Sequence, residues 1–271
     1  MGTEKEVERV QGAAYVRLAS RATVGLNPAE TVQDEADLSF ASGVLVSRGK
    51  RVFVATAAHY LDEVPPAEMT IMFCSELAGS GKNLAEVKEG IESGDAGVFL
   101  ADKLAVLSHR LGSVVEDVAL IEISPSSVRP GCWSYPLGSR DCEDAMPQES
   151  ESVWIAGLPS MSHIRLGKKQ LARVLQVRQC PTVQVTNPEN WSTFDPECHF
   201  AIKYEVAKLP DRLPPQGLSG SGVWRMSFKR TESGLEIPSP VLIGIQIAHN
   251  DVRGCLKVTS VRRLLNLLPS T

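Results

Sequence analysis

Short runs rich in hydrophobic and β-branched residues recur along the chain, and glycine, proline and asparagine separate them. Runs of this kind predict β-strands. They lie at 13–19, 41–47, 51–57, 69–74, 103–109, 117–123, 152–158, 171–179, 182–186, 199–206, 221–228, 240–248 and 255–259. Because the predicted strands are many and short, the pattern favours an all-β fold built of barrels or sandwiches.

Hydrophobic residues follow helical spacing in only two segments. The first is 82–94, where Gly94 provides a stop signal. The second is 259–268, which opens with Thr and Ser as candidate caps. Val261, Leu264, Leu265 and Leu268 share one face of this second helix, and we expect that face to pack on the β core.

The stretch 124–152 breaks the pattern, because it is rich in proline, serine and acidic residues. Such a composition indicates a connection between two β halves. We therefore expect an N-terminal barrel over 1–124, a linker over 125–151, and a C-terminal barrel with its helix over 152–271.

Composition narrows the class of protein. The chain has 271 residues, of which 43% are hydrophobic and 22% charged, as in ordinary globular proteins. The net charge of −4 lacks the basic excess that nucleic-acid binding requires. The charged start MGTEKEVERV and the absence of an 18-residue hydrophobic window predict no secretory leader and no membrane span.

The six cysteines are irregularly spaced, and no CxxC pair occurs among them. This pattern supports neither a zinc site nor a redox motif. We expect reduced thiols in a cytoplasmic protein, with no metal and no cofactor.

Three segments have the residue types needed for acyl transfer, which uses a nucleophile, a base and a group that orients the base. His59 follows a strand that ends in small residues, and Asp117 stands directly before a hydrophobic strand. Ser219 lies between Gly217 and Gly220 in a tight turn. Taken singly, each has a plain alternative: a structural histidine, a solvated aspartate and a Gly-Ser turn without function.

In this order the three segments resemble the trypsin-like (chymotrypsin-fold) serine peptidases. The family's TAAH segment is matched at 56–59, its Asp-plus-apolar-strand segment at 117–121, and its Gly-x-Ser-Gly segment at 217–220. The α/β-hydrolase elbow Gly-x-Ser-x-Gly is not matched, because position 221 is Ser. The resemblance implies two antiparallel six-stranded β-barrels with a C-terminal helix.

The resemblance also implies roles for these residues. Ser219 would be the nucleophile, His59 the general base and then acid, and Asp117 the residue that orients His59. The N–H groups of Gly217 and Ser219 would form the oxyanion hole. Ser221 is expected to be a packing residue.

Two departures from the family pattern bear on the cell compartment and on activation by cleavage, which we expect not to operate here. Tyr60 follows the histidine, where secreted members have a disulfide-bonded cysteine. Leu218 occupies the position of the acid that pairs with a newly cleaved N-terminus. The sequence therefore resembles an intracellular, disulfide-free, bacterial-type branch, and family analogy suggests a bacterial stress or defence system.

Four residues are expected to bind substrate, by position relative to the family's pocket. Leu213 stands where trypsins have an acid, so a preference for Lys or Arg is not supported. Gln216 is expected at the pocket entrance. Gln246 replaces the histidine of some relatives that cleave after Glu or Gln. His249 either lines the pocket or is a rim or surface histidine.

Three hypotheses stay open. The leading one is an active cytoplasmic serine endopeptidase that cleaves proteins or peptides. The second is a pseudoprotease that uses the same fold to bind peptides or partners. The third is an enzyme that stays inactive until an activating protein partner or a ligand reshapes its oxyanion loop.

Overall fold

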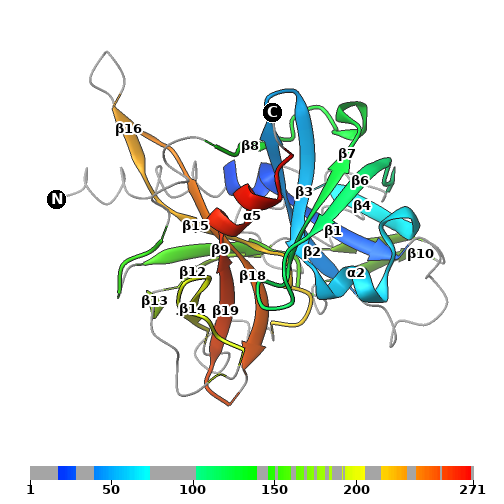
Figure 1. Cartoon of the computed structure of the whole chain (residues 1–271). Helices are drawn as coiled ribbons and strands as arrows, with labels where there is room; N and C mark the ends of the chain where they lie inside the picture. The colour runs from blue at the N-terminus through cyan, green and yellow to red at the C-terminus, as the bar shows by residue number, and fades with distance from the viewer. Residues whose placement is uncertain are drawn as a thin grey trace.

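The regular structure of the described residues is mainly β-strand, and most of these strands lie in two large sheets (Figure 1). The structure is a computed structural model. It describes residues 18–28, 40–73, 102–138, 146–149, 152–159, 163–167, 170–173, 176–180, 183–184, 191, 193–204, 215–230, 236–250 and 252–269. Within these ranges every strand pair is antiparallel except that of β2 (Ala41–Arg48) with β8 (Tyr135–Pro136).

The first sheet has the order β5-β4-β1-β2-β3-β7-β6, and β8 pairs in parallel with β2. Its strands are β1 (Thr23–Pro28), β2 (Ala41–Arg48), β3 (Arg51–Ala57), β4 (Met69–Phe73), β5 (Asp102–Lys103), β6 (Val106–Leu111), β7 (Val118–Ile123) and β8 (Tyr135–Pro136).

The second sheet has the order β12-β9-β15-β18-β19-β14-β13. Its strands are β9 (Val153–Gly157), β12 (Gln176–Cys180), β13 (Val183–Gln184), β14 (His199–Lys203), β15 (Gly222–Arg225), β18 (Val241–Asn250) and β19 (Cys255–Ser260). Two hairpins stand apart from it: β10 (His163–Gly167) with β11 (Gln170–Arg173), and β16 (Phe228–Arg230) with β17 (Glu236–Pro238).

The described part of each sheet contains six strands of at least four residues. The others, β5, β8 and β13, are two residues long. The expected all-β, chymotrypsin-like architecture is confirmed. The division at 124 and 151 stays a prediction, and β8 lies within the predicted linker.

The central strands of the first sheet, β2, β3 and β7, are mostly buried on both faces. On β3, Val54 belongs to the core inside the first sheet, whereas Phe53 and Ala55 belong to a larger core shared with the second sheet. Neighbouring side chains of a strand point to opposite faces, so one strand contributes to both cores. This double burial joins the two sheets through the shared core.

Helices are short and lie at the edges of the sheets. Among the described residues they are a helical stretch at 18–22, α2 (His59–Glu63), α5 (Val261–Leu267) and the 3₁₀ turns η2 (Pro66–Glu68) and η3 (Pro125–Ser127). The predicted C-terminal helix is confirmed as α5, with Ser260 accepting a hydrogen bond from Arg262 N at 3.4 Å as its cap. It packs against β7 of the first sheet and against β18 and β19 of the second.

Two other expectations have different outcomes. The predicted helix 82–94 lies outside the described residues. The strand expected at 13–19 is wrong at its end, because residues 18–22 are helical. Ala19 and Ala22 are buried there, and alanine is the strongest helix former.

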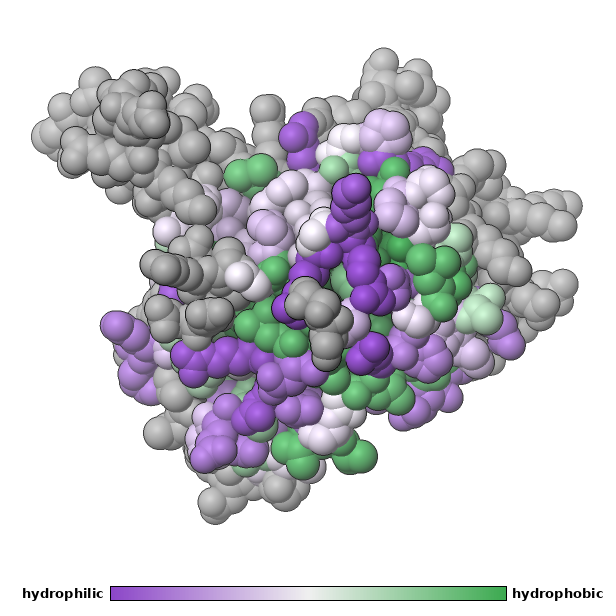
Figure 2. All heavy atoms as spheres, turned by 45° about the horizontal axis from the view of Figure 1, so that its top comes forward, coloured by the Kyte–Doolittle hydropathy of each residue, from purple (hydrophilic) through white to green (hydrophobic). Residues whose placement is uncertain are grey.

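The surface is mixed in character. Hydrophobic residues on the face seen in Figure 2 lie in separate groups among hydrophilic ones. None of the helices within the described ranges is long and hydrophobic enough to cross a membrane.

Candidate active site

His59 is positioned by the end of β3 and the start of α2. The small residues Ala57 and Ala58 precede it, and Ala58 N donates to the main-chain oxygen of Asp117 at 2.9 Å. Small side chains allow this close approach of the two backbones. The main chain therefore places the histidine beside the aspartate, independently of any contact made by its ring.

The Asp117 carboxylate binds His59 twice. Oδ2 lies 2.8 Å from the ring Nδ1, and Oδ1 accepts from the His59 main-chain N–H at 2.8 Å. An ionised carboxylate only accepts, so Nδ1 has the proton and Nε2 is available as a base. The hydrogen bond to Asp117 is the main reason that the pKa of His59 is raised above 6.5.

Asp117 itself has a left-handed backbone, with φ of 47°. Aspartate tolerates this region better than most residues. The conformation turns its carboxylate toward His59 at the exact point where the loop after β6 becomes β7. The carboxylate is about one-fifth exposed, at 21%, against 43% for the His59 side chain.

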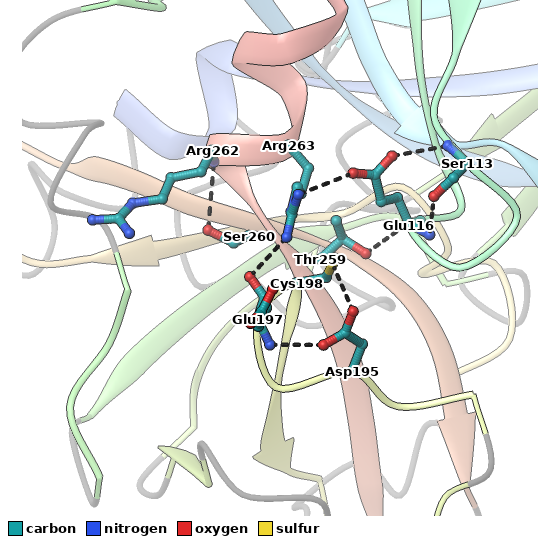
Figure 3. Close-up of polar contacts among 9 residues, drawn as sticks. All are labelled: Ser113, Glu116, Asp195, Glu197, Cys198, Thr259, Ser260, Arg262 and Arg263. Carbon is teal, nitrogen blue, oxygen red and sulfur yellow. Dashed lines mark hydrogen bonds and ion pairs between the residues drawn. The ribbon is translucent and has the colours of Figure 1, made fainter.

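The loop before Asp117 is braced by the second sheet and by α5 (Figure 3). Thr259 Oγ1 on β19 donates to the main-chain oxygen of Glu116 at 2.6 Å. The Glu116 carboxylate accepts from Ser113 N at 2.8 Å and lies 3.6 Å from the Arg263 guanidinium of α5. The residue that orients the histidine is thus held from both halves of the molecule.

Ser219 lies in a tight loop before β15. Leu218 N donates to Pro215 O at 3.0 Å, and Gly217 between them has φ of 81°. This combination is a type II turn with glycine at its third position. Gly220 follows Ser219 with φ of 88°, so two glycines allow the chain to bend on either side of the serine.

The N–H groups of this loop are used unequally. Leu218 N, Gly220 N and Ser221 N donate to Pro215 O, Gln246 O and Leu218 O, at 3.0, 2.8 and 2.7 Å. Ser219 N has no acceptor among the described residues. An N–H without an acceptor, on a half-buried serine, is available to an oxygen of a bound molecule.

Ser219 and His59 are brought close through shared neighbours. The main-chain oxygen of Ser219 accepts from Ser42 N at 2.7 Å, and Thr56 Oγ1 donates to Ser42 O at 2.8 Å. Thr56 lies three residues before His59 on β3. Within the described part of the chain, no hydrogen bond connects the Ser219 hydroxyl with the His59 ring.

Leu218 and Ser221 are buried and point into the second sheet. Leu218 is 1% exposed and belongs to the large shared core. Ser221 is fully buried against Gly157, and its hydroxyl has no partner among the described residues. This placement agrees with a packing role for Ser221, which leaves Ser219 as the half-exposed serine of the loop.

The four predicted substrate-binding residues have unlike surroundings. Leu213 lies outside the described residues. Gln216 is exposed, and His249 is half-buried near the end of β18. Gln246 is buried behind the loop, where its Nε2 donates to Ala248 O at 3.0 Å.

The described cysteines Cys132, Cys198 and Cys255 are free thiols. Burial raises the pKa of Cys198 to about 11, so this thiol stays protonated. Its neighbour His199 accepts from Asp195 N at 2.9 Å, and the Cys198 thiol donates to the Asp195 carboxylate at 3.3 Å. No group of three or more potential metal ligands occurs in the described part of the chain.

Sequence reasoning missed Ser42 and the brace on Glu116. Ser42 lies in the hydrophobic strand 41–47. A serine inside such a strand could have indicated a buried hydrogen-bonding role. Thr259 gave no signal, because threonine is common in strands.

Comparison with known proteins supports the fold. No protein-family model matches the chain, and no curated protein matches it. Among solved structures, the scabies mite inactivated protease paralogue S-I1 matches with a TM-score of 0.54 and 18% identity. The match covers 92% of this chain and 93% of that chain. At this identity the likeness establishes a chymotrypsin-like fold and nothing further.

Proposed function

We propose that the protein is a serine endopeptidase that hydrolyses peptide bonds through an acyl-enzyme intermediate. The observation that carries the proposal is the two-point bond between Asp117 and His59, at 2.8 Å for each contact. A carboxylate that fixes both the ring and the main chain of a histidine gives the imidazole one tautomer and one orientation.

In the proposed reaction, His59 Nε2 removes the proton of Ser219 Oγ as the oxygen attacks the substrate carbonyl. The oxyanion that forms accepts hydrogen bonds from the N–H groups of Ser219 and Gly217. His59 then gives the proton to the leaving amine, and the ester on Ser219 is hydrolysed by water in the reverse sense. The Ser219–His59 hydrogen bond forms when substrate closes the site, as is common in such sites.

The proposal includes a cytoplasmic location and control by a partner protein or ligand, as in a bacterial stress or defence system. Leu218 supports it, because a buried leucine cannot form the ion pair that would couple the loop to a new N-terminus. An open site in the cytoplasm would degrade host proteins, so restraint has to come from outside the loop.

A second candidate is a peptide-binding protein without catalysis. One observation favours it: the Ser219 hydroxyl and the His59 ring share no hydrogen bond in the described structure. The similar scabies mite protein is called an inactivated protease paralogue, which shows that the fold is also found without activity.

A fluorophosphonate probe and a proteome-derived peptide library distinguish the two candidates. We expect wild-type protein to be labelled on Ser219 and to cut peptides. Ser219→Ala should abolish labelling and lower kcat by a factor on the order of 10⁶. The matched control is Ser221→Ala, which removes a buried hydroxyl of the same loop. This variant should leave the labelling and kcat unchanged.

Two outcomes would count against this assignment. Activity that survives Ser219→Ala and disappears in Ser221→Ala would identify the other serine as the nucleophile. A wild type that is neither labelled nor active, with and without cell extract as a source of activator, would favour the peptide-binding candidate.

A further inference from the structure

Ser42 on β2 is a fully buried serine whose polar groups contact both segments that make the candidate site, as well as the end of β9. It belongs to the first sheet, whereas Ser219 belongs to the second. A serine in a hydrophobic strand is normally satisfied within its own sheet. The hydroxyl of Ser42 instead reaches across to the other sheet.

The Ser42 hydroxyl has a fixed direction. It accepts from Leu158 N at 2.8 Å and donates to Gly217 O at 2.8 Å. Because an N–H only donates and a carbonyl only accepts, the single hydroxyl proton must point to Gly217. The side chain therefore connects the end of β9 to the loop that holds Ser219.

The main chain of Ser42 holds the same loop at a second point. Ser42 N donates to Ser219 O at 2.7 Å. Its carbonyl oxygen accepts from Thr56 Oγ1 at 2.8 Å, on the strand that leads to His59. One residue thus fixes the carbonyls on both sides of Leu218 and joins them to the histidine segment.

The peptide between Gly217 and Leu218 is held at both ends. Leu218 N donates to Pro215 O at 3.0 Å, and Gly217 O accepts from Ser42. Glycine passes easily between backbone regions, so φ of 81° at Gly217 is not maintained by the residue itself. Without the hydroxyl, the Gly217 carbonyl loses its Ser42 partner. This peptide lies between the two peptides that contain the N–H groups of Gly217 and Ser219, so its displacement shifts the backbone from which both N–H groups project.

We propose that Ser42 is a positioning residue that holds the oxyanion loop in its competent geometry. The inference rests on the proposed function and extends it. In the related peptidases an ion pair with a newly cleaved N-terminus holds this loop, and here Ser42 takes its place. Leu218 anchors the loop by burial, and Ser42 holds the carbonyls of Gly217 and Ser219, so the peptide that contains the Ser219 N–H lies between two fixed peptides. The loop is thereby formed in the intact chain without cleavage.

The test compares Ser42→Ala with Ser221→Ala. Both remove a buried serine hydroxyl beside the same loop, but only the first hydroxyl has hydrogen-bond partners among the described residues. We expect Ser42→Ala to lower kcat by about tenfold to a hundredfold, less than the loss of a direct oxyanion donor. KM should change little, and affinity for a peptidyl trifluoromethyl ketone should fall by the same factor as kcat.

Hydrogen–deuterium exchange over 215–221 gives a second measurement that does not need activity. Exchange there should rise in Ser42→Ala and stay at the wild-type level in Ser221→Ala. If Ser42→Ala does not fold, Ser42→Cys keeps the shape with a weaker donor, and its loop should exchange at a rate above wild type.

The outcomes separate the two proposals. Wild-type values of kcat, inhibitor affinity and loop exchange in Ser42→Ala would overturn the role of Ser42 while leaving the peptidase proposal intact. A fall in kcat matched by an equal rise in KM, with unchanged exchange, would also overturn it. A wild type without labelling or hydrolysis would overturn the peptidase proposal, and loop exchange alone would then decide whether Ser42 holds the loop.

Discussion

At the scale of single residues, Asp117 has the most specialised environment in the candidate site. Its backbone is left-handed, its main-chain oxygen accepts from Ala58 N, and its carboxylate binds His59 through two atoms. Each contact constrains the same imidazole. The aspartate therefore fixes both the place and the protonation of the proposed base.

This environment predicts the pH dependence of hydrolysis. The pKa of His59 is raised above 6.5, chiefly by the hydrogen bond to Asp117, so the ring stays protonated to higher pH. A general base must be neutral, and we therefore expect the acidic limb of kcat/KM to have its midpoint above 6.5. The measurement is kcat/KM for a peptide substrate between pH 5 and 9.

Asp117→Asn is the matching variant. Asparagine keeps the shape but removes the charge and favours the wrong tautomer, so kcat should fall by a factor of about 10⁴. A wild-type midpoint below 6.5, or an Asn variant with unchanged kcat, would contradict the assigned role of Asp117.

His59 and Asp117 could be predicted from the sequence because the residues next to each of them along the chain indicate their positions. Small residues before His59 and a hydrophobic strand after Asp117 are visible in short stretches, and the structure pairs the two side chains. Ser42 could not be found in this way. Its partners are Gly217 and Leu158, and only the folded chain brings them to β2.

At the scale of elements, the loop before β15 depends on close approach to the first sheet. A Cβ added to Gly220 would collide with the Ser42 carbonyl oxygen and with Thr56 Oγ1. Gly220 also has φ of 88°. The loop can lie against β2 and β3 only because this position has no side chain.

Gly220→Ala should therefore lower the free energy of unfolding more than the replacement of a turn glycine that has no close neighbours. Gly49→Ala is the control, because Gly49 has φ of 59° and no atom within 4 Å of an added Cβ. We expect Gly49→Ala to reduce the free energy of unfolding by about 1–2 kcal/mol. Gly220→Ala should exceed that and also reduce labelling of Ser219.

Urea unfolding of both variants and the rate of fluorophosphonate labelling would check this prediction. Equal losses of stability in the two variants would mean that the contact with Ser42 and Thr56 relaxes without consequence. Labelling at the wild-type rate in Gly220→Ala would mean that the loop tolerates the displacement.

Elements were predictable where the hydrophobic pattern was strong. The central strands β2, β3, β7 and β18 and the helix α5 lie where the pattern placed them. β1 was missed, because Gly25, Asn27 and Pro28 disfavour strands, yet pairing with β2 and β4 imposes one. The single strand expected at 171–179 is divided between β11 and β12, which pair in different sheets.

At the scale of the whole molecule, the junction of the two sheets includes a buried histidine outside the candidate site. His199 on β14 has no exposed surface. Burial, with the charge of Lys257, lowers its pKa from 6.5 to about 4. The folded protein therefore holds this imidazole neutral, whereas the unfolded chain takes up a proton near pH 6.5.

Stability should consequently fall as the pH drops from about 6.5 toward 4, because the unfolded state binds the proton first. At about 1.4 kcal/mol per pKa unit, the loss from His199 is on the order of 3 kcal/mol. His199→Gln should show a shallower decline than wild type over this range. The measurement is the free energy of unfolding by urea at several pH values.

His109→Gln is the control for this comparison, because His109 is exposed on the edge strand β6. We expect its pH dependence to match that of wild type. Parallel curves of unfolding free energy against pH for wild type and His199→Gln would contradict this prediction. They would mean that His199 binds its proton equally well in the folded and the unfolded state.

The bond between Ser42 and Gly217 also has a consequence for biosynthesis, since it spans 175 residues of chain. When the ribosome has made the first sheet, Ser42 is present but the loop that it holds has not been translated. The loop in turn needs β18, because Gly220 N donates to Gln246 O. A nascent chain therefore has no assembled site, and the proposed peptidase would become competent only after β18 has been translated.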